Sequence, residues 1–272
     1  MKKITVLVFQ YKTIYLNIEA NLLKMERLIK KYFYLKTDLV VFPEYSLTGP
    51  LFSNYNLSLA DDSFVYERLS LFAKKYHINL IPGSFIRKVG KDNYNYNSSC
   101  LINRDGVNLG FYDKQYLWSS EKKFLVAGDK DVVFKTDFGK VAIQICADLH
   151  SSKLSDQYRK HMPDIIVNLA MWALEDVSGH KKIVPENIEF LQTEYLSRAR
   201  AVENRCYFIF CNFADNLDII AKTGRVYKET SVGNSMIVNP YGEIIVKASN
   251  HKEEVIMAEI DLTKNNWSKY NY

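Results

Sequence analysis

The sequence is poor in cysteine. Among its 272 residues there are four, Cys100, Cys146, Cys206 and Cys211, at irregular spacing and mostly inside strand-like runs. Disulfide frameworks are typical of short secreted chains with many cysteines, so we expect reduced thiols and a cytoplasmic protein. No second pair of cysteines or histidines stands at the spacing of zinc ligands, which argues against a metal site.

Long hydrophobic runs and clusters of basic residues are also missing. A membrane span requires about 18 apolar residues in succession, whereas the run before Gln10 has six residues, most of them apolar. That run is too short for the core of a signal peptide. The formal charge of +5 comes from scattered lysines, so we expect neither a membrane nor a nucleic acid as a partner.

Three common signatures are absent as well. The chain contains no G-x-S-x-G, no P-loop and no G-x-G-x-x-G. The first absence argues against a serine hydrolase of the nucleophile-elbow type, and the other two argue against loops that bind phosphate.

The composition is ordinary for a globular protein. Hydrophobic residues make up 47% of the chain and charged residues 25%, which lies within the usual range. No linker rich in Pro, Gly or Ser divides the sequence. We therefore expect one domain over residues 1–272, with 263–272 as a carboxyl-terminal tail.

Strand-like and helical patterns alternate along most of the chain. Short β-branched and aromatic runs predict strands at 4–10, 37–44, 78–86, 98–106, 140–146, 164–171, 206–213, 234–242 and 255–262. Apolar residues at helical spacing predict helices at 17–35, 62–77 and 190–206. The runs NRDG and NPYG predict hairpin turns, and the part from residue 230 predicts an added antiparallel hairpin. The alternation predicts an α/β fold, in which reactive side chains collect beyond the carboxyl ends of strands.

Three reactive side chains lie at such places. Cys146 ends the run KVAIQIC, and Glu44 follows the apolar run LVVFP. Lys114 lies in a connector that contains glycines, aromatic residues and charges of both signs. A glutamate against an apolar wall has a raised pKa, which suits a general base. A thiol beside a base and a cation can act as a nucleophile.

Each of these residues also has an ordinary interpretation. Free cysteine is among the most buried residue types, and glutamate and lysine are mostly solvated. Cys146, Asp148 and His150 could instead be metal ligands at alternating positions. A cysteine–histidine dyad is also open, although no pattern marks a partner among the five histidines.

Six motifs, in order, resemble those of the nitrilase superfamily, the carbon–nitrogen hydrolases. They are FPEYSLTG, YDKQYLWSSE, IQICAD, PDIIVNLAMWA, YLSRARAVENRCYFIFCN and GNSMIVNPYGEIIVKAS. Together they extend the resemblance over almost the whole chain. It implies a four-layer α-β-β-α sandwich without a metal or an organic cofactor. It also implies a homodimer or higher homo-oligomer in which helices of two sandwiches pack together.

The resemblance also assigns chemical roles. It implies that Cys146 forms a thioester with the substrate, that Glu44 is the general base and that Lys114 stabilises the oxyanion. The backbone N–H of Ala147 would be the second oxyanion donor. Glu121 would orient the substrate or Lys114, and it could accept the N–H groups that an amide presents and a nitrile does not.

The pocket residues indicate a substrate class. Tyr45, directly after the glutamate, and Trp118, four places after the lysine, are similar to those of aliphatic amidases in the superfamily. We expect His150 and Trp172 to add further walls. The resemblance thus implies an amidase with a small-molecule amide as its substrate. The alternatives are a nitrilase, an N-carbamoyl amidohydrolase, an acyl-transferring relative, a glutaminase subunit that supplies ammonia to a separate synthetase, and a catalytically silent binding protein.

Two segments are candidates for the contact between subunits. The charged helix around Arg198, Arg200, Glu203 and Asn204 either faces the partner or braces the fold internally. The aromatic tail, residues 263–272, either crosses to the partner or is frayed.

Overall fold

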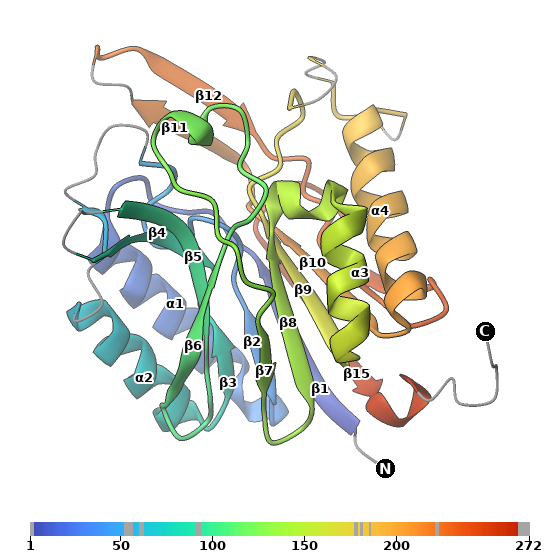
Figure 1. Cartoon of the computed structure of the whole chain (residues 1–272). Coiled ribbons are helices and arrows are strands. Elements are labelled where there is room, and N and C mark those ends of the chain that lie inside the picture. Colours follow the sequence, from blue (N-terminus) through green and yellow to red (C-terminus); the bar gives the residue numbers. More distant parts are fainter. Residues whose placement is uncertain are drawn as a thin grey trace.

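Two β-sheets pack face to face, and a pair of helices covers the outer face of each (Figure 1). The computed structural model describes residues 3–51, 57–59, 63–90, 94–176, 179, 182–184, 186–220 and 223–265. This arrangement confirms the predicted four-layer α-β-β-α sandwich.

The first sheet has the strand order β15-β1-β2-β3-β5-β4, with β6 paired to β5. Strands β1, β2 and β3 run parallel, and the other pairs are antiparallel. The strand bounds are β1 Lys3–Gln10, β2 Leu39–Val41, β3 Asn79–Ile81, β4 Ser84–Val89, β5 Tyr94–Ile102, β6 Asn108–Asp113 and β15 Glu254–Asp261. Helices α1 (Ile18–Tyr32) and α2 (Phe64–Tyr76) cover its outer face (Figure 1).

The second sheet has the order β14-β13-β10-β9-β8-β7, with β8, β9 and β10 parallel. The strand bounds are β7 Val133–Lys135, β8 Lys140–Ile145, β9 Ile165–Ala170, β10 Tyr207–Asn212, β13 Met236–Val238 and β14 Ile244–Lys247. Helices α3 (Ser152–His161) and α4 (Ile188–Asn204) cover its outer face (Figure 1). A separate ribbon contains β11 (Asn216–Ile220) and β12 (Val226–Thr230). Short 3₁₀ turns occur at η1 Phe33–Leu35, η3 Glu121–Lys123, η4 Cys146–His150 and η5 Leu262–Asn265.

The core forms where the sequence is most apolar. Strands β8, β9 and β10 are almost entirely buried, as expected for parallel strands that are covered on both faces. In α1, the buried residues Leu22, Met25 and Ile29 recur at helical spacing toward the first sheet. Between the sheets, the thiol of Cys211 donates to the carbonyl of Phe9 at 3.4 Å.

Three of the four cysteines are packing residues, as expected. Cys100, Cys206 and Cys211 are fully buried in strands or beside them. Burial raises the pKa of Cys100 to about 12, which makes it inert as a nucleophile.

Some predicted elements differ from the structure. The run 78–86 is two strands, β3 and β4, because Pro82 and Gly83 interrupt it. Gly83 has φ +91°, and a Cβ built there would lie 2.0 Å from the carbonyl oxygen of Pro43. The predicted turns do join β5 to β6 and β13 to β14. After the β13–β14 hairpin, however, the chain crosses from the second sheet to the first, where β15 pairs with β1.

Helix α4, which was predicted either to face a partner subunit or to brace the fold, makes internal contacts through two of its polar side chains. Arg200 donates to the carbonyl of Leu149 at 3.1 Å and to Glu203 at 2.8 Å. Asn204 donates to Ser155 of α3 at 2.7 Å. The internal bracing role therefore holds for Arg200 and Asn204, which are buried.

The structure describes only the start of the predicted carboxyl-terminal tail. Of the predicted tail, residues 263–265 belong to η5, and residues 266–272 lie outside the described part. Within the described residues, every helix is too short or too polar to cross a membrane.

Candidate active site

The predicted site residues follow strands that end at the same edge of the fold. Glu44 comes three residues after β2, Lys114 directly after β6, and Cys146 directly after β8. Strand β6 is antiparallel to β5, which is antiparallel to β3, so β6 runs in the direction of β2. A parallel bridge between Tyr11 and Phe213 joins the two sheets just beyond β1 and β10. The carboxyl ends of both sheets therefore meet in one crevice, as in other α/β folds.

Cys146 directly follows β8 and is the first residue of the 3₁₀ turn η4. Its φ is +48°, whereas Ile145 before it is extended. This left-handed conformation is unfavourable for a residue with a Cβ, and such strain collects at functional sites. Asn168 of β9 holds the turn by donating to the carbonyl of Cys146 at 3.3 Å. Cys146 and Ala147, the first two residues of η4, both line the crevice.

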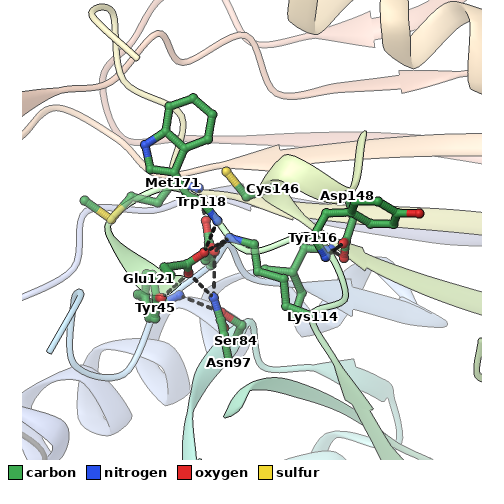
Figure 2. A network of polar contacts seen from close by, with 12 residues as sticks. Tyr45, Ser84, Asn97, Lys114, Tyr116, Trp118, Glu121, Cys146, Asp148 and Met171 are labelled. Carbon is green, nitrogen blue, oxygen red and sulfur yellow. Dashed lines mark hydrogen bonds and ion pairs between the residues drawn. The ribbon is translucent and has the colours of Figure 1, made fainter. Parts of the chain in front are cut away.

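Asp148 ties this turn to the connector that contains Lys114. Its Oδ2 accepts from the backbone N–H of Ile145 at 2.8 Å and from the hydroxyl of Tyr112 at 2.7 Å. Its Oδ1 accepts from the backbone N–H of Tyr116 at 2.8 Å (Figure 2). Asp148 thus acts as a buried hydrogen-bond acceptor. No three His, Cys, Asp or Glu side chains of the described chain form a group that could hold a metal ion.

A buried lysine joins two carboxylates. Lys114 Nζ lies 2.8 Å from Glu121 Oε2 (Figure 2). It also lies 2.9 Å from Glu44 Oε1, and the lysine side chain is 1% exposed. Asn97 of β5 bridges the same carboxylates, with Nδ2 at 2.8 Å from Glu44 and 3.0 Å from Glu121. The interpretation of Lys114 as a surface lysine is therefore wrong, as is that of Glu44 as a solvated loop residue, because both are buried.

The two carboxylates differ in what they can still accept. A carboxylate has about four acceptor positions. Glu121 receives four bonds, from Tyr45 Oη, Asn97 Nδ2, the Trp118 N–H and Lys114 Nζ. Glu44 receives three, from Lys114, Asn97 and the Met171 N–H. Within the described residues, one position on Glu44 Oε2 stays open, whereas Glu121 has none for a substrate N–H.

The charge states follow from burial and from these contacts. Burial lowers the pKa of Lys114, but the charges of Glu44 and Glu121 outweigh it and raise that pKa well above 10.5. Burial raises the pKa of Glu44 despite the opposing charge of Lys114. Burial also acts to raise the pKa of Glu121, but the positive charge of Lys114 outweighs this effect, so the pKa is lowered. Burial and the charge of Glu44 raise the pKa of Cys146 well above 9.0, so the resting thiol is protonated.

A cavity of about 130 Å³ opens onto this network. Every residue predicted for the site lines it: Glu44, Tyr45, Lys114, Trp118, Glu121, Cys146, Ala147, His150 and Trp172. A volume of this size suits a small molecule. Its remaining walls are largely apolar and include Leu51, Ile86, Leu125 and Ile219.

Two predicted wall residues make contacts that define their part in the pocket. The Tyr45 hydroxyl donates to Glu121 Oε1 at 2.6 Å, so it holds that carboxylate. The Trp172 indole N–H donates to Glu189 at 2.7 Å, and the residue lines the cavity. The rings of His150 and Trp172 lie 5.0 Å apart, and His150 is exposed at the rim.

Sequence reasoning missed three contributors to the site. Asn97 is an asparagine within a polar strand, and no spacing distinguishes it from its neighbours. Met171 contributes through its backbone N–H, which a sequence pattern cannot reveal. Asp176 lines the cavity from the loop after β9, where no motif marks it.

Comparisons with known proteins agree with this geometry. Residues 5–266 match the family model described as carbon-nitrogen hydrolase. The chain is 27% identical to the 2-oxoglutaramate amidase of Bacillus subtilis over 266 residues, which is 96% of this chain and 92% of that protein. It is also 27% identical to a protein of Schizosaccharomyces pombe named as a probable nitrilase, with 87% and 80% covered.

A solved structure shares the fold. Nit3 of Saccharomyces cerevisiae, described as a member of branch 10 of the nitrilase superfamily, superposes with a TM-score of 0.84. The two chains are 25% identical, and the match covers 98% of this chain and 93% of Nit3.

Proposed function

The chain belongs to the carbon–nitrogen hydrolase family, and from this premise we propose that it hydrolyses a small carboxamide through a thioester on Cys146. One observation carries the proposal: the network of Glu44, Lys114 and Glu121 lines the same small cavity as the cysteine. A relative named 2-oxoglutaramate amidase supports an amide as the substrate class.

In the first step, Cys146 attacks the carbonyl carbon of the amide. Because its raised pKa keeps the thiol protonated at rest, the proton moves to Glu44 as the S–C bond forms. The open acceptor position on Glu44 and its raised pKa suit it to this role.

The carbonyl oxygen becomes an oxyanion in the same step. Lys114 Nζ has three N–H groups and gives two of them to carboxylates, which leaves one for the oxyanion. The Ala147 N–H, in the first turn of η4 where helical N–H groups have no partner within the helix, supplies the second donor. Each such donor contributes about 3 kcal/mol of transition-state stabilisation.

The intermediate then collapses and the C–N bond breaks. Glu44 returns its proton to the leaving nitrogen, ammonia departs, and the acyl group stays on Cys146 as a thioester. Glu44 next takes a proton from water, whose oxygen attacks the thioester carbon. The C–S bond breaks, the thiolate regains a proton from Glu44, and a carboxylic acid leaves. No oxidant or reductant is required.

Glu121 is a positioning residue in this proposal. Its four contacts leave it no position for a substrate N–H. Of the two predicted roles, we therefore assign it the orientation of Lys114. An expected preference for amides over nitriles then rests on Glu44, which can protonate a leaving amine.

The alternatives concern the same cavity. A nitrilase keeps some support from the relative named as a probable nitrilase, and N-carbamoyl compounds or acyl transfer to an amine would use the same thioester. A silent binding protein has less support, because the buried charges of Glu44 and Lys114 are costly to keep without a function.

A homodimer and a cytoplasmic location complete the proposal. Helix α4 exposes a stripe of apolar residues at helical spacing: Ile188, Leu191, Tyr195 and Val202. Such a face suits burial against a second copy, and light scattering of Tyr195→Glu against the unaltered protein would test it. The free cysteines suit a reducing compartment, which fractionation of expressing cells would test.

The decisive experiment is a screen for ammonia release from matched amides, nitriles and N-carbamoyl compounds. Cys146→Ala serves as the blank, and Cys206→Ala, which removes a buried thiol outside the cavity, serves as the control. We expect amide turnover in the unaltered protein and in Cys206→Ala alone. Turnover of nitriles alone would favour the nitrilase, and turnover by Cys146→Ala would refute the thioester mechanism.

A further inference from the structure

Two acidic residues line the cavity in addition to the proposed catalytic network. Asp176 lies in the loop after β9, and Glu229 lies on β12. Neither has a part in the mechanism above. Asp176 lines the same cavity as the nucleophile, and its charge raises the pKa of Cys146. A small substrate held at Cys146 therefore shares the cavity with Asp176.

The fold holds this part of the wall in place. The Asp176 side chain accepts from the Ala173 N–H at 2.8 Å, which closes a turn. The Leu174 N–H donates to the carbonyl of Thr230 at 2.9 Å, and Ala173 forms a bridge with Ser231. These contacts fasten the loop after β9 to the end of β12, so the two acids share one region of the wall.

The charge balance of the cavity is acidic. Among the lining residues that the structure describes, the acids are Glu44, Glu121, Asp176 and Glu229, and Lys114 is the one lysine or arginine. The charge of Lys114 is already matched by two carboxylates. Within the described part of the lining, a substrate carboxylate would therefore meet more acidic than basic side chains, and this would disfavour binding.

The surroundings of Asp176 disfavour its charged form. Burial raises its pKa to about 7, the Ala173 N–H lowers it, and the charges of Glu229, Glu189 and Glu44 raise it. A bound ammonium group would stabilise the carboxylate form. The same cavity has apolar walls such as Ile86 and Ile219, which suit a short methylene chain.

On the premise of the proposed amidase function, we infer that the substrate carries a positively charged amino group at the end remote from its amide. Asp176 is the residue that selects it. This differs from the relative named 2-oxoglutaramate amidase, because the compound in that name carries a carboxylate. Specificity in this chain would thus lie in the charge of the remote group.

The test compares amides that share a three-carbon spacer and differ in the end group. The probes are γ-aminobutyramide, which is cationic, butyramide, which is neutral, and glutaramate, which is anionic. We expect kcat/KM to fall in that order. In Asp176→Asn, the ratio of cationic to neutral substrate should fall about tenfold or more, since hydrogen bonds to charged groups are the stronger ones.

A matched control separates contact from general charge. Asp218 on β11 is exposed and next to Ile219, which lines the cavity. Asp218→Asn removes the same charge on the opposite face of that strand and should leave the ratio unchanged. A preference for glutaramate, or an unchanged ratio in Asp176→Asn, would overturn the inference.

Binding distinguishes a failure of this inference from a failure of the proposed function. Calorimetric titration of Cys146→Ala with the same three amides requires no turnover. Tighter binding of γ-aminobutyramide, lost in Cys146→Ala/Asp176→Asn, would support the charge preference even if no amide were hydrolysed. Equal binding of all three would refute it even if butyramide were a good substrate.

Discussion

Replacement of Lys114 by methionine should change the effect of the Glu121 carboxylate on the stability of the fold from stabilising to destabilising. The lysine lies 2.9 Å from Glu44 and 2.8 Å from Glu121, and each contact is a gross attraction of about 6 kcal/mol at an effective dielectric constant of about 20. Desolvation offsets most of this attraction. Loss of one partner from a buried ion pair costs about 3–5 kcal/mol, and we expect that loss for Lys114→Met near pH 8.

The effect of Glu121→Gln on stability should differ between the unaltered protein and the Lys114→Met variant. In the unaltered protein it should destabilise by about 1.5–3 kcal/mol, because bonds to a charged acceptor are lost. In Lys114→Met, the same change removes one of two neighbouring buried negative charges, so it should stabilise. The single variant Lys114→Met should also recover stability as the pH falls, because protonation then discharges the carboxylates.

Urea unfolding with linear extrapolation measures all four proteins of this cycle. Lys3 and Glu259 supply the control cycle, since they lie 2.7 Å apart but are 53% and 59% exposed. Exposed pairs couple weakly, so Lys3→Met and Glu259→Gln should be close to additive. If Glu121→Gln destabilised both backgrounds equally, the three residues would not form one electrostatic unit, and the reasoning would fail.

Three further predictions concern the supports of the site. Asn97→Ala removes a donor that lowers the pKa of Glu44, so the rising limb of kcat/KM should move to higher pH; an unmoved limb would contradict this. Burial raises the pKa of Asp148 from 3.8 to about 6, so the folded state favours the protonated carboxyl. The stability that this preference contributes is lost as the pH rises from about 4 to about 6. The unaltered protein should therefore lose stability relative to Asp148→Asn over that interval in urea titrations, and a constant difference would refute the assignment. Gly83→Ala should destabilise by about 3 kcal/mol and reduce turnover, because its Cβ would meet the carbonyl of Pro43, the residue before Glu44. Gly90→Ala has φ +72°, and apart from the chain neighbours no described atom lies within 4 Å of an added Cβ; it controls for backbone strain and should keep its activity.

Sequence reasoning worked best where pattern and position coincide. Cys146 and Glu44 end apolar runs that form buried strands, so their place at a sheet edge could be predicted. Helix α3 was missed because it is polar, with Leu154 and Tyr158 as its large buried side chains. The ribbon β11–β12 was missed because its strands have five residues each and β12 has no buried residue that would give an alternating apolar pattern.

The supports of the site could not be predicted for a physical reason. Asn97 and Asp148 matter through distances to residues far along the chain, such as Glu44 and Tyr112. A single sequence contains no record of such contacts. The number of acceptor positions left on Glu121 is likewise a property of the folded site, and it decided between two roles that the residues alone left open.

The pairing of β1 with β15 has a consequence for biosynthesis. Lys3 pairs with Asp261 and Gln10 with Glu254, so strand β1 obtains this neighbour only after residues 254–261, far along the chain, have left the ribosome. Until then it presents an apolar edge, and exposed edges of this kind invite pairing with other chains. The nascent protein would therefore depend on chaperones while translation is still in progress, and a premature stop before β15 would yield an aggregating product.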